Sequence, residues 1–188
     1  LRTTVELDIL PRNVAKLVQL PKQSRKEMDV LSKAEVIKFL NALEGERYGT
    51  MLSFAIATGM RVQEYLGLQW KDIDFERGTA TVQRAIVWFR KGGGWEFSQP
   101  KTSKSRRTIP LPKETLAQLK THRKTQLEER MKMGSTWSYN DLVFPSEIGT
   151  PLNPPNVTRA FKKILTKASI RTSIRLYDLR HTTATLLL

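Results

Sequence analysis

Residues 48–75, YGTMLSFAIATGMRVQEYLGLQWKDIDF, decide the fold, because they hold a buried helix, its end and the start of the next helix. Residues 48–59 are apolar on nearly every side, which indicates a helix enclosed by other elements. Gly59 is its expected end, since glycine readily adopts the left-handed conformation that closes a helix. Arg61 then falls at or near the first turn of a short helix. A helix start offers unpaired N–H groups and a positive dipole end, which both favour a phosphate.

Apolar spacing predicts further helices on both sides of this stretch. Ser32 and Glu35 match a capping box that opens a helix over residues 31–43. Its expected apolar face consists of Val36, Ile37, Leu40 and Leu43. Helical patterns also cover residues 112–134, 156–168 and 178–188.

The N-terminal residues have a different character. Residues 1–9 are typical of the end of a helix that Pro11 stops. Prolines and charges alternate with polar residues from there to residue 30, which indicates a linker or a wrapped segment.

The middle of the chain predicts strands instead of helices. Residues 79–90, TATVQRAIVWFR, are β-branched and aromatic, and residues 95–100 and 106–111 are short strand candidates. Gly-rich and Ser-rich turns separate them, at residues 91–94 and 101–105. The predicted fold class is therefore mostly α with a small antiparallel β-sheet (α+β).

The charge balance points to a polyanionic partner. The chain has 188 residues, with 32 Lys and Arg against 18 Asp and Glu, for a net charge of +14. This excess favours nucleic acid, and an anionic membrane surface is the weaker alternative because no basic amphipathic helix is recognisable. The absence of cysteine excludes disulfides, thiolate chemistry and Cys-based zinc sites. The length suits one domain with a small appendage.

Three basic residues stand at positions suited to a phosphate. Arg61 lies at a helix start, Lys101 at a turn between two strand candidates, and Arg180 near the start of the last helix, three residues after Tyr177. That spacing places Tyr177 and Arg180 on one helix face. Two guanidinium groups can each bind phosphate oxygens bidentately, which suits a transition state with charge on several oxygens.

Each residue also has a simpler interpretation. Arg61 could form an ion pair with Glu64, and Arg180 could pair with Asp178 or Asp72. Lys101 could belong to a solvated basic turn. From the residues alone, the chain is a basic, helical, nucleic-acid-binding protein with a possible phosphate site.

Three segments resemble the tyrosine recombinase (phage integrase) family, in the family's order. Residues 57–75, ATGMRVQEYLGLQWKDIDF, resemble its first arginine box, and residues 100–111, PKTSKSRRTIPL, its lysine-bearing β-turn. Residues 176–188, LYDLRHTTATLLL, resemble its second arginine box. The resemblance implies a catalytic domain over residues 30–188, incomplete at its C-terminus, and the end of a core-binding domain with a linker over residues 1–29.

The resemblance also implies a reaction, site-specific DNA breaking and rejoining. Arg61 and Arg180 would bind the scissile phosphate, and Lys101 would protonate the leaving 5′-oxygen. A tyrosine would attack and leave a 3′-phosphotyrosyl intermediate, without a cofactor. The family usually has His where Tyr177 stands. Because an ordinary phenol, with a pKa of about 10, is a poor base at neutral pH, Tyr177 is expected to contact phosphate.

The family's nucleophilic tyrosine follows the second arginine box, beyond Leu188. Tyr48, Tyr65, Tyr139 and Tyr177 do not stand in its usual context. The expectation is therefore no nucleophile within the chain, and a piece of a longer integrase that binds DNA without cleaving it alone. The alternative is a non-catalytic helical DNA-binding protein on the same scaffold.

The remaining expectations concern the surroundings of the site. Glu64 and His181 would support it, and Asp72 and Asp74 lack the companions of a metal site, so no metal is expected. The partners would be double-stranded DNA and other integrase protomers, a tetramer in the full-length protein, with no membrane. The location would be cytoplasmic and nucleoid-associated, with a bacterial, phage or mobile-element gene. The expected DNA-binding residues are Lys104, Arg106, Arg107, Arg159, Lys162 and Lys163.

Overall fold

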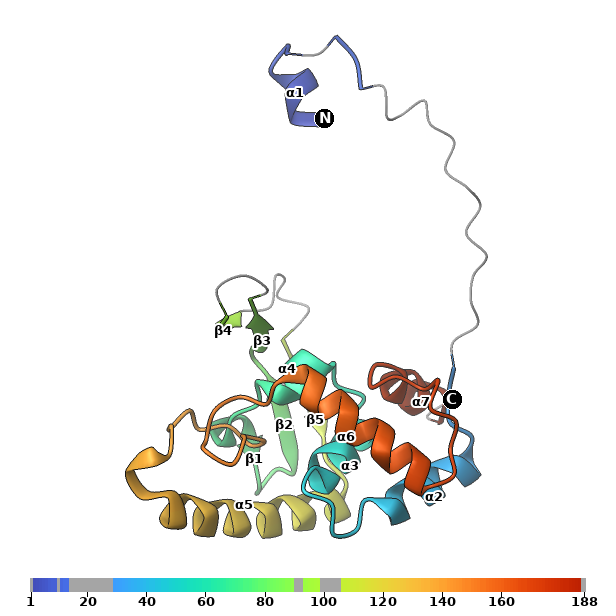
Figure 1. Cartoon of the computed structure of the whole chain (residues 1–188), viewed down its shortest axis with the longest axis vertical. Helices are drawn as coiled ribbons and strands as arrows, with labels where there is room; N and C mark the ends of the chain where they lie inside the picture. The colour runs from blue at the N-terminus through green and yellow to red at the C-terminus, as the bar shows by residue number, and fades with distance from the viewer. Residues whose placement is uncertain (1, 10, 14–28, 90–92, 99–105, 187–188) are drawn as a thin grey trace.

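The structure is a computed structural model that describes residues 2–9, 11–13, 29–89, 93–98 and 106–186 (Figure 1). Lys101 and Lys104 lie outside the described residues, as does most of the predicted linker. The helices and strands are α1 (Arg2–Glu6), α2 (Lys33–Ala42), α3 (Gly49–Thr58), α4 (Val62–Leu66), η2 (Trp70–Asp72), β1 (Ile73–Asp74), β2 (Thr79–Val82), β3 (Ala85–Trp88), β4 (Trp95–Ser98), β5 (Arg107–Pro110), α5 (Lys113–Met133), η4 (Gly134–Thr136), α6 (Pro154–Lys167) and α7 (Asp178–Leu186).

Helix α3 is the buried centre of the fold, as its apolar sequence predicts. Gly59 ends it in the left-handed conformation, with φ at 59°. Helix α7 packs against α3, and the Thr183 hydroxyl donates a hydrogen bond of 2.6 Å to the Ile56 carbonyl oxygen. The start of α4 and the start of α7 are thereby brought to the same end of α3. The buried residues of α3 are Gly49, Met51, Leu52, Phe54, Ala55 and Ile56.

The strands form two small antiparallel sheets instead of the single sheet that the sequence predicted. One has the order β1-β2-β5, with Val82 opposite Arg107, and the other pairs β3 with β4. The run over residues 79–90 breaks after β2, where Arg84 forms an ion pair with the buried Asp72. The two sheets separate between β2 and β3, at the position of this ion pair.

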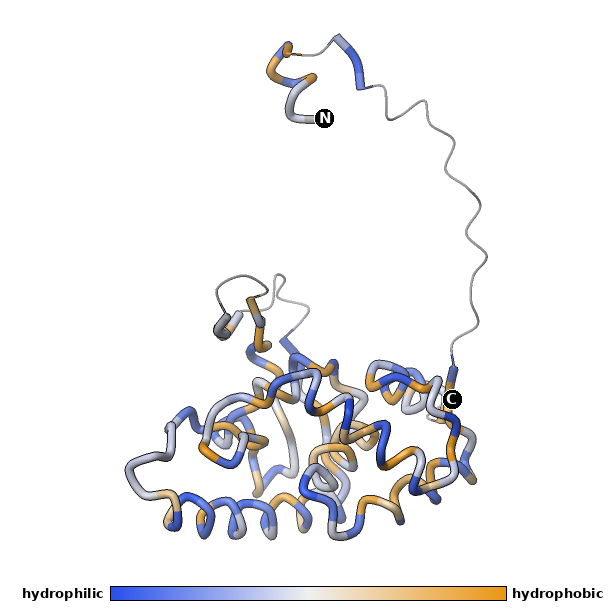
Figure 2. Tube along the Cα trace, in the orientation of Figure 1, coloured by the Kyte–Doolittle hydropathy of each residue, from blue (hydrophilic) through white to orange (hydrophobic). Residues whose placement is uncertain are grey.

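The helices surround the first sheet, and the β3–β4 hairpin stands beside them. Figure 1 shows the long helix α5 along the bottom edge, α6 across the front, and α2 and α7 at the right. In Figure 2 most of α5 is hydrophilic, consistent with its place at the edge of the molecule. The predicted fold class, mostly α with a small antiparallel β-component, is confirmed. No helix in the described part of the chain is long and apolar enough to cross a bilayer.

The predicted apolar face of α2 is wrong in part. Ile37 is 60% exposed and Leu40 is 39% exposed, whereas Phe39 is fully buried. The Phe39 ring packs edge-on against Phe161 of α6, with 5.8 Å between ring centroids. Because α2 has apolar residues on two sides, burial of the large aromatic ring decides which side faces the core.

His122 on α5 stands among lysine and arginine residues in the sequence, but its ring packs against aromatic side chains in the structure. Its ring lies between Trp70 and Phe144, with centroid distances of 6.1 and 5.4 Å. Its Nε2 atom lies 2.7 Å from the Val143 carbonyl oxygen. Burial lowers the pKa of His122 below its usual value. Its surroundings therefore favour a neutral imidazole that packs in the fold.

Candidate active site

Arg61 occupies the N-cap position of α4, directly after the turn that ends α3. Its backbone is extended, and its N–H donates to Glu64 Oε2 at 2.9 Å. Its side chain turns to the same carboxylate, with 2.9 Å from Nη1 to Oε1, and remains 47% exposed. The predicted ion pair with Glu64 and the predicted exposure to a ligand therefore coexist, because only Nη1 is committed to Glu64.

Glu64 is buried and joins Arg61 to the first sheet. Arg107, at the start of β5, donates from Nη1 and Nη2 to the two carboxylate oxygens, at 3.1 and 2.7 Å. Burial raises the pKa of Glu64, but the hydrogen bonds from Arg107 and Arg61 outweigh it, so this pKa lies below its usual value. Sequence reasoning assigned Arg107 to DNA and missed this contact, because 43 residues separate it from Glu64.

Arg180 lies in the first turn of α7, and its side chain reaches the turn that ends α3. Its Nη1 donates to the Gly59 carbonyl oxygen at 2.5 Å. Neither alternative ion pair forms, because Asp178 bonds to Arg175 and Asp72 bonds to Arg84. Gly59 precedes Arg61 by two residues, so the two predicted arginines are brought together although the sequence separates them widely.

Tyr177 immediately precedes α7 and lies beside Arg61. It is 46% exposed, and its ring meets His181 edge-on with 5.0 Å between centroids. The Glu64 carboxylate and, to a smaller degree, Tyr177 raise the pKa of Arg61 above its usual value. The site therefore combines two guanidinium groups with a half-exposed phenol. His181 contacts the phenol ring of Tyr177.

Helix α7 is held from two directions. On one side, Thr183 and Arg180 bond to carbonyl oxygens of α3 and its terminal turn. On the other side, the Leu31 N–H donates to Thr182 Oγ1 at 3.0 Å, and this hydroxyl donates to the Asp178 carbonyl oxygen at 2.9 Å. The segment that enters α2 is thus bonded directly to the helix that carries Arg180.

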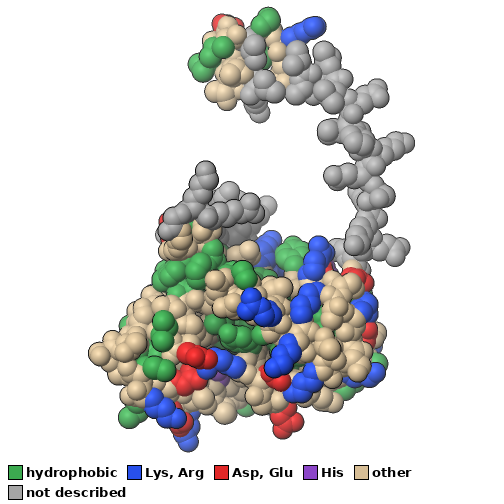
Figure 3. Space-filling model, in the orientation of Figure 1, with side chains coloured by type: hydrophobic (Ala, Val, Ile, Leu, Met, Phe, Trp, Pro, Cys, Tyr) green, Lys and Arg blue, Asp and Glu red, His purple; other side chains and the backbone are tan. Residues whose placement is uncertain are grey.

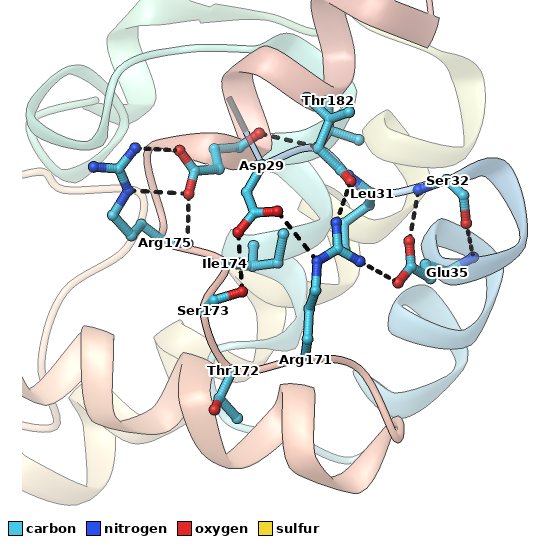
Figure 4. Close-up of polar contacts among 12 residues, drawn as sticks. Asp29, Leu31, Ser32, Glu35, Arg171, Thr172, Ser173, Ile174, Arg175 and Thr182 are labelled. Atoms are coloured by element: carbon cyan, nitrogen blue, oxygen red, sulfur yellow. Dashed lines mark hydrogen bonds and ion pairs between the residues drawn. The ribbon is translucent and has the colours of Figure 1, made fainter. Parts of the chain in front are cut away.

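A polar cluster fixes this entry segment (Figure 4). Arg171 donates to Asp29 at 3.3 Å, to Glu35 at 2.5 Å and to the Val30 carbonyl oxygen at 2.6 Å. The predicted capping box of Ser32 and Glu35 is confirmed, with reciprocal hydrogen bonds of 2.8 and 3.2 Å. The chain before α2 and the chain before α7 are therefore tied together by charged groups of both signs.

The predicted DNA-binding residues have different surroundings. Arg159 and Lys163 are exposed on α6, and Figure 3 shows Lys and Arg side chains along this helix. Lys162, by contrast, donates from Nζ to the carbonyl oxygens of Thr172 and Ile174, at 2.6 Å for the latter, and so supports the chain before α7. Arg106 is exposed just before β5.

The carboxylates considered for a metal already have partners. Asp72 accepts from Arg84 and from the Gln69 N–H at 2.9 Å. Asp74 Oδ1 accepts the N–H groups of Glu76 and Arg77 at 3.0 and 2.8 Å. In the described ranges, no three His, Asp or Glu side chains form a metal-binding group.

Comparison with known proteins identifies the family of this chain. A family model described as "Phage integrase family" matches residues 29–188. A "Tyrosine recombinase XerC-like" protein of Caldanaerobacter subterraneus subsp. tengcongensis is 37% identical over 170 residues, covering 85% of this chain and 43% of the relative. The ICEBs1 integrase of Bacillus subtilis is 31% identical over 188 residues, covering 99% of this chain and 50% of the relative. The chain spans about half the length of the curated relatives it matches.

A solved structure gives the same fold at low identity. The Tn1549 transposon integrase, in complex with transposon right end DNA, superposes with a TM-score of 0.78. It is 19% identical, and the match covers 99% of this chain and 62% of the other. At this identity the likeness concerns the fold alone.

Proposed function

The chain belongs to the phage integrase family, and we propose that it is the catalytic domain of a tyrosine recombinase that breaks and rejoins DNA at specific sites. The observation that carries the proposal is the convergence of Arg61 and Arg180 on the turn after α3. Named relatives of the family are integrases of mobile elements, which supports integration or excision as the biological setting.

Arg61 and Arg180 bind the scissile phosphate. Both guanidinium groups approach one turn, and Arg61 keeps about half of its surface exposed. Planar guanidinium groups bind two phosphate oxygens at once, which stabilises charge that spreads over them in the transition state. Tyr177, beside Arg61, donates its hydroxyl hydrogen to a phosphate oxygen.

The reaction is balanced without a cofactor. A tyrosine hydroxyl gives its proton to water, its oxygen forms a bond to phosphorus, and the bond from phosphorus to the 5′-oxygen breaks. We propose Lys101, which lies outside the described residues, as the acid that gives the leaving 5′-oxygen its proton. The 3′-phosphotyrosyl bond retains the energy of the phosphodiester, so the reverse attack rejoins the strands.

None of the four tyrosines of this sequence is proposed as the nucleophile. Tyr65 is buried, and burial raises the pKa of its hydroxyl, which disfavours the attacking anion. The Arg130 guanidinium lies over the Tyr139 ring, 4.8 Å from the ring centroid, so this tyrosine is engaged with Arg130. Tyr48 packs partly buried against the core. Tyr177 is assigned to phosphate contact, so we propose no attacking tyrosine among these four, and we propose that this chain alone binds DNA without cleaving it.

The partner is double-stranded DNA, and further protomers assemble on it. The net charge of +14 supports binding through the phosphate backbone. The proposed reaction requires access to genomic DNA, so we propose a cytoplasmic location at the nucleoid. Exposed basic residues on α6 and beside β5 supply backbone contacts.

The test uses a nicked duplex that traps the covalent intermediate, with the gene product that contains this sequence. Arg61→Ala and Arg180→Ala should each abolish the covalent complex and leave DNA affinity within about threefold, because two contacts are lost among many. Lys120→Ala, an exposed residue of α5 outside the proposed DNA contacts, is the control and should cleave normally. Normal cleavage by the arginine variants contradicts the site. DNA binding without cleavage by the unmodified protein favours the alternative, a non-catalytic DNA-binding protein on this scaffold.

A further inference from the structure

We propose that Arg107 is a positioning residue that presents Arg61 to the phosphate, and not a DNA contact. The inference rests on the proposed function of the Arg61 site and adds a residue that acts on it through Glu64. The first observation is that the guanidinium groups of Arg107 and Arg61 donate hydrogen bonds to the same carboxylate, that of Glu64. Arg107 binds Glu64 with both Nη atoms, at 3.1 and 2.7 Å, whereas Arg61 commits one Nη atom, at 2.9 Å.

Exposure separates the two arginines in the same way. The Arg107 side chain is 29% exposed and the Arg61 side chain is 47% exposed, while Glu64 is 8% exposed. Arg107 therefore faces inward and donates a hydrogen bond to each oxygen of the Glu64 carboxylate. Arg61 faces outward with its remaining donors directed to the solvent side of the site.

The sheet fixes where the Arg107 side chain can go. Arg107 pairs with the buried Val82 of β2, and Ile109 lies on the same face of β5 two residues later. Arg106 and Thr108 take the opposite, exposed face, as strand alternation requires. The chain thus offers two adjacent arginines of the same charge, one turned to Glu64 and one turned to solvent.

Removal of Arg107 has two physical consequences for Arg61. A buried carboxylate with fewer donors draws further hydrogen bonds from the guanidinium that remains, which turns Arg61 away from the phosphate. The pKa of Glu64 also rises, because two charge-assisted hydrogen bonds from Arg107 are lost. The charged and titratable groups that face Glu64 are Arg61 on its own helix and Arg107 on β5, with Tyr177 next to Arg61. Protonation of Glu64 at moderately low pH then removes the group that orients Arg61.

The cleavage test compares Arg107→Ala and Arg107→Lys with the control Lys120→Ala, an exposed residue of α5 outside the proposed DNA contacts, which should cleave normally. Arg107→Ala should lower single-turnover cleavage by roughly ten- to a hundredfold, the usual cost of a misplaced charged group. Its cleavage should also fall at a higher pH on acidification than that of the unmodified protein. Arg107→Lys should restore part of the rate, since it keeps the charge but not the fork. The slope of log affinity against log salt should be unchanged in Arg107→Ala, whereas each lost phosphate contact reduces it by about 0.9.

A second measurement does not depend on cleavage. Inorganic phosphate is added to this chain while the guanidinium NMR signals of Arg61 are followed. In the unmodified chain these signals should shift, and in Arg107→Ala about ten times more phosphate should be needed, as expected for a lost preorganised donor. Glu64→Gln gives the same loss if Arg107→Ala does not fold, because the neutral amide no longer orients Arg61.

The outcomes separate the inference from the proposed function. An unmodified protein that forms no covalent complex, together with weaker phosphate binding in Arg107→Ala, contradicts the proposed function and keeps the positioning role. Normal phosphate binding, an unchanged pH profile and a shallower salt slope in Arg107→Ala overturn the inference and make Arg107 a DNA contact.

Discussion

Gly59 is the residue on which the two arginines depend most closely. Its φ is +59°, and its carbonyl oxygen accepts the Arg180 hydrogen bond. A Cβ atom here would lie 3.3 Å from Cβ and Cγ2 of Thr183, which holds α7 on α3. We predict that Gly59→Ala costs about 2 kcal/mol, from the left-handed conformation together with the contact. Urea unfolding measures this loss.

Gly45→Ala is the matched control for that prediction. Gly45 also has a positive φ, 73°, but an added Cβ would meet nothing within 4 Å. It should therefore lose about 1 kcal/mol, the conformational part alone. Equal losses in the two variants would show that Thr183 adapts without cost, and the proposed dependence of α7 on this glycine would be wrong.

The Asp178 carboxylate makes the stability of α7 depend on pH. Asp178 is fully buried and accepts from the Arg175 N–H, Nε and Nη2 at 2.7, 3.1 and 2.9 Å. Burial raises its pKa, but these hydrogen bonds outweigh it and the pKa is lowered from 3.8. Because the folded pKa lies below the unfolded one, the stabilisation is present above about pH 4 and is lost as the pH falls through the folded pKa.

Arg175→Ala should move this loss to higher pH. The variant keeps the backbone N–H but removes the guanidinium, so the folded pKa of Asp178 rises. Urea unfolding between pH 3 and 7 should then show stability declining from a higher pH than in the unmodified chain. Arg159→Ala, an exposed arginine of α6, should follow the unmodified curve. Identical curves for both variants would contradict the role of Arg175.

At the scale of elements, the entry segment before α2 is coupled to α7. Arg171 donates hydrogen bonds to Asp29, Val30 and Glu35. Leu31, which follows Val30, donates its N–H to Thr182. We predict that Arg171→Ala accelerates hydrogen exchange at the Leu31 amide and in α7, while the amides of α5 exchange as before. Lys163→Ala should change neither. Unaltered exchange at Leu31 would show that the Thr182 bond holds the segment without the ionic cluster.

The elements also show what sequence patterns can predict. The capping box of α2, the end of α3 at Gly59 and the N-terminal position of Arg61 depend on neighbours within four residues, and all three agree with the structure. The buried side of α2 was missed because two apolar sides compete, and only the position of Phe161 decides between them. A single sheet was expected because the β-branched and aromatic pattern runs on over residues 79–90, and this pattern does not indicate which strands pair.

The site residues also differ in whether the sequence could predict them. A resemblance in the order of three segments selected Arg61, Arg180 and Tyr177, and the fold brings these residues together. Nothing local marks Arg107 as a partner of Glu64, because neighbouring positions in a basic turn look alike until strand register is known. Arg107 and Arg106 therefore differ in function only because their side chains point to opposite faces of the strand.

At the scale of the whole molecule, the excess of positive charge is large. In the proposed function, the distribution of this charge determines where DNA binds. Arg159 and Lys163 are exposed on α6, the helix that leads toward the arginine site, and Lys120 and Lys124 are exposed on α5 at the edge. Both pairs carry the same charge. A general attraction to the net charge of +14 would make their removal equivalent.

We predict that the pairs differ. Affinity for duplex DNA should fall about a thousandfold or more between 50 and 200 mM salt, as for proteins that contact six or more phosphates. Arg159→Ala with Lys163→Ala should weaken binding at fixed salt and reduce the slope of log affinity against log salt by nearly 2, about 0.9 for each lost phosphate contact. Lys120→Ala with Lys124→Ala should retain the slope. Because both double variants lose two positive charges, equal effects would mean that DNA responds to the overall field, and α6 would then not define the DNA-binding face.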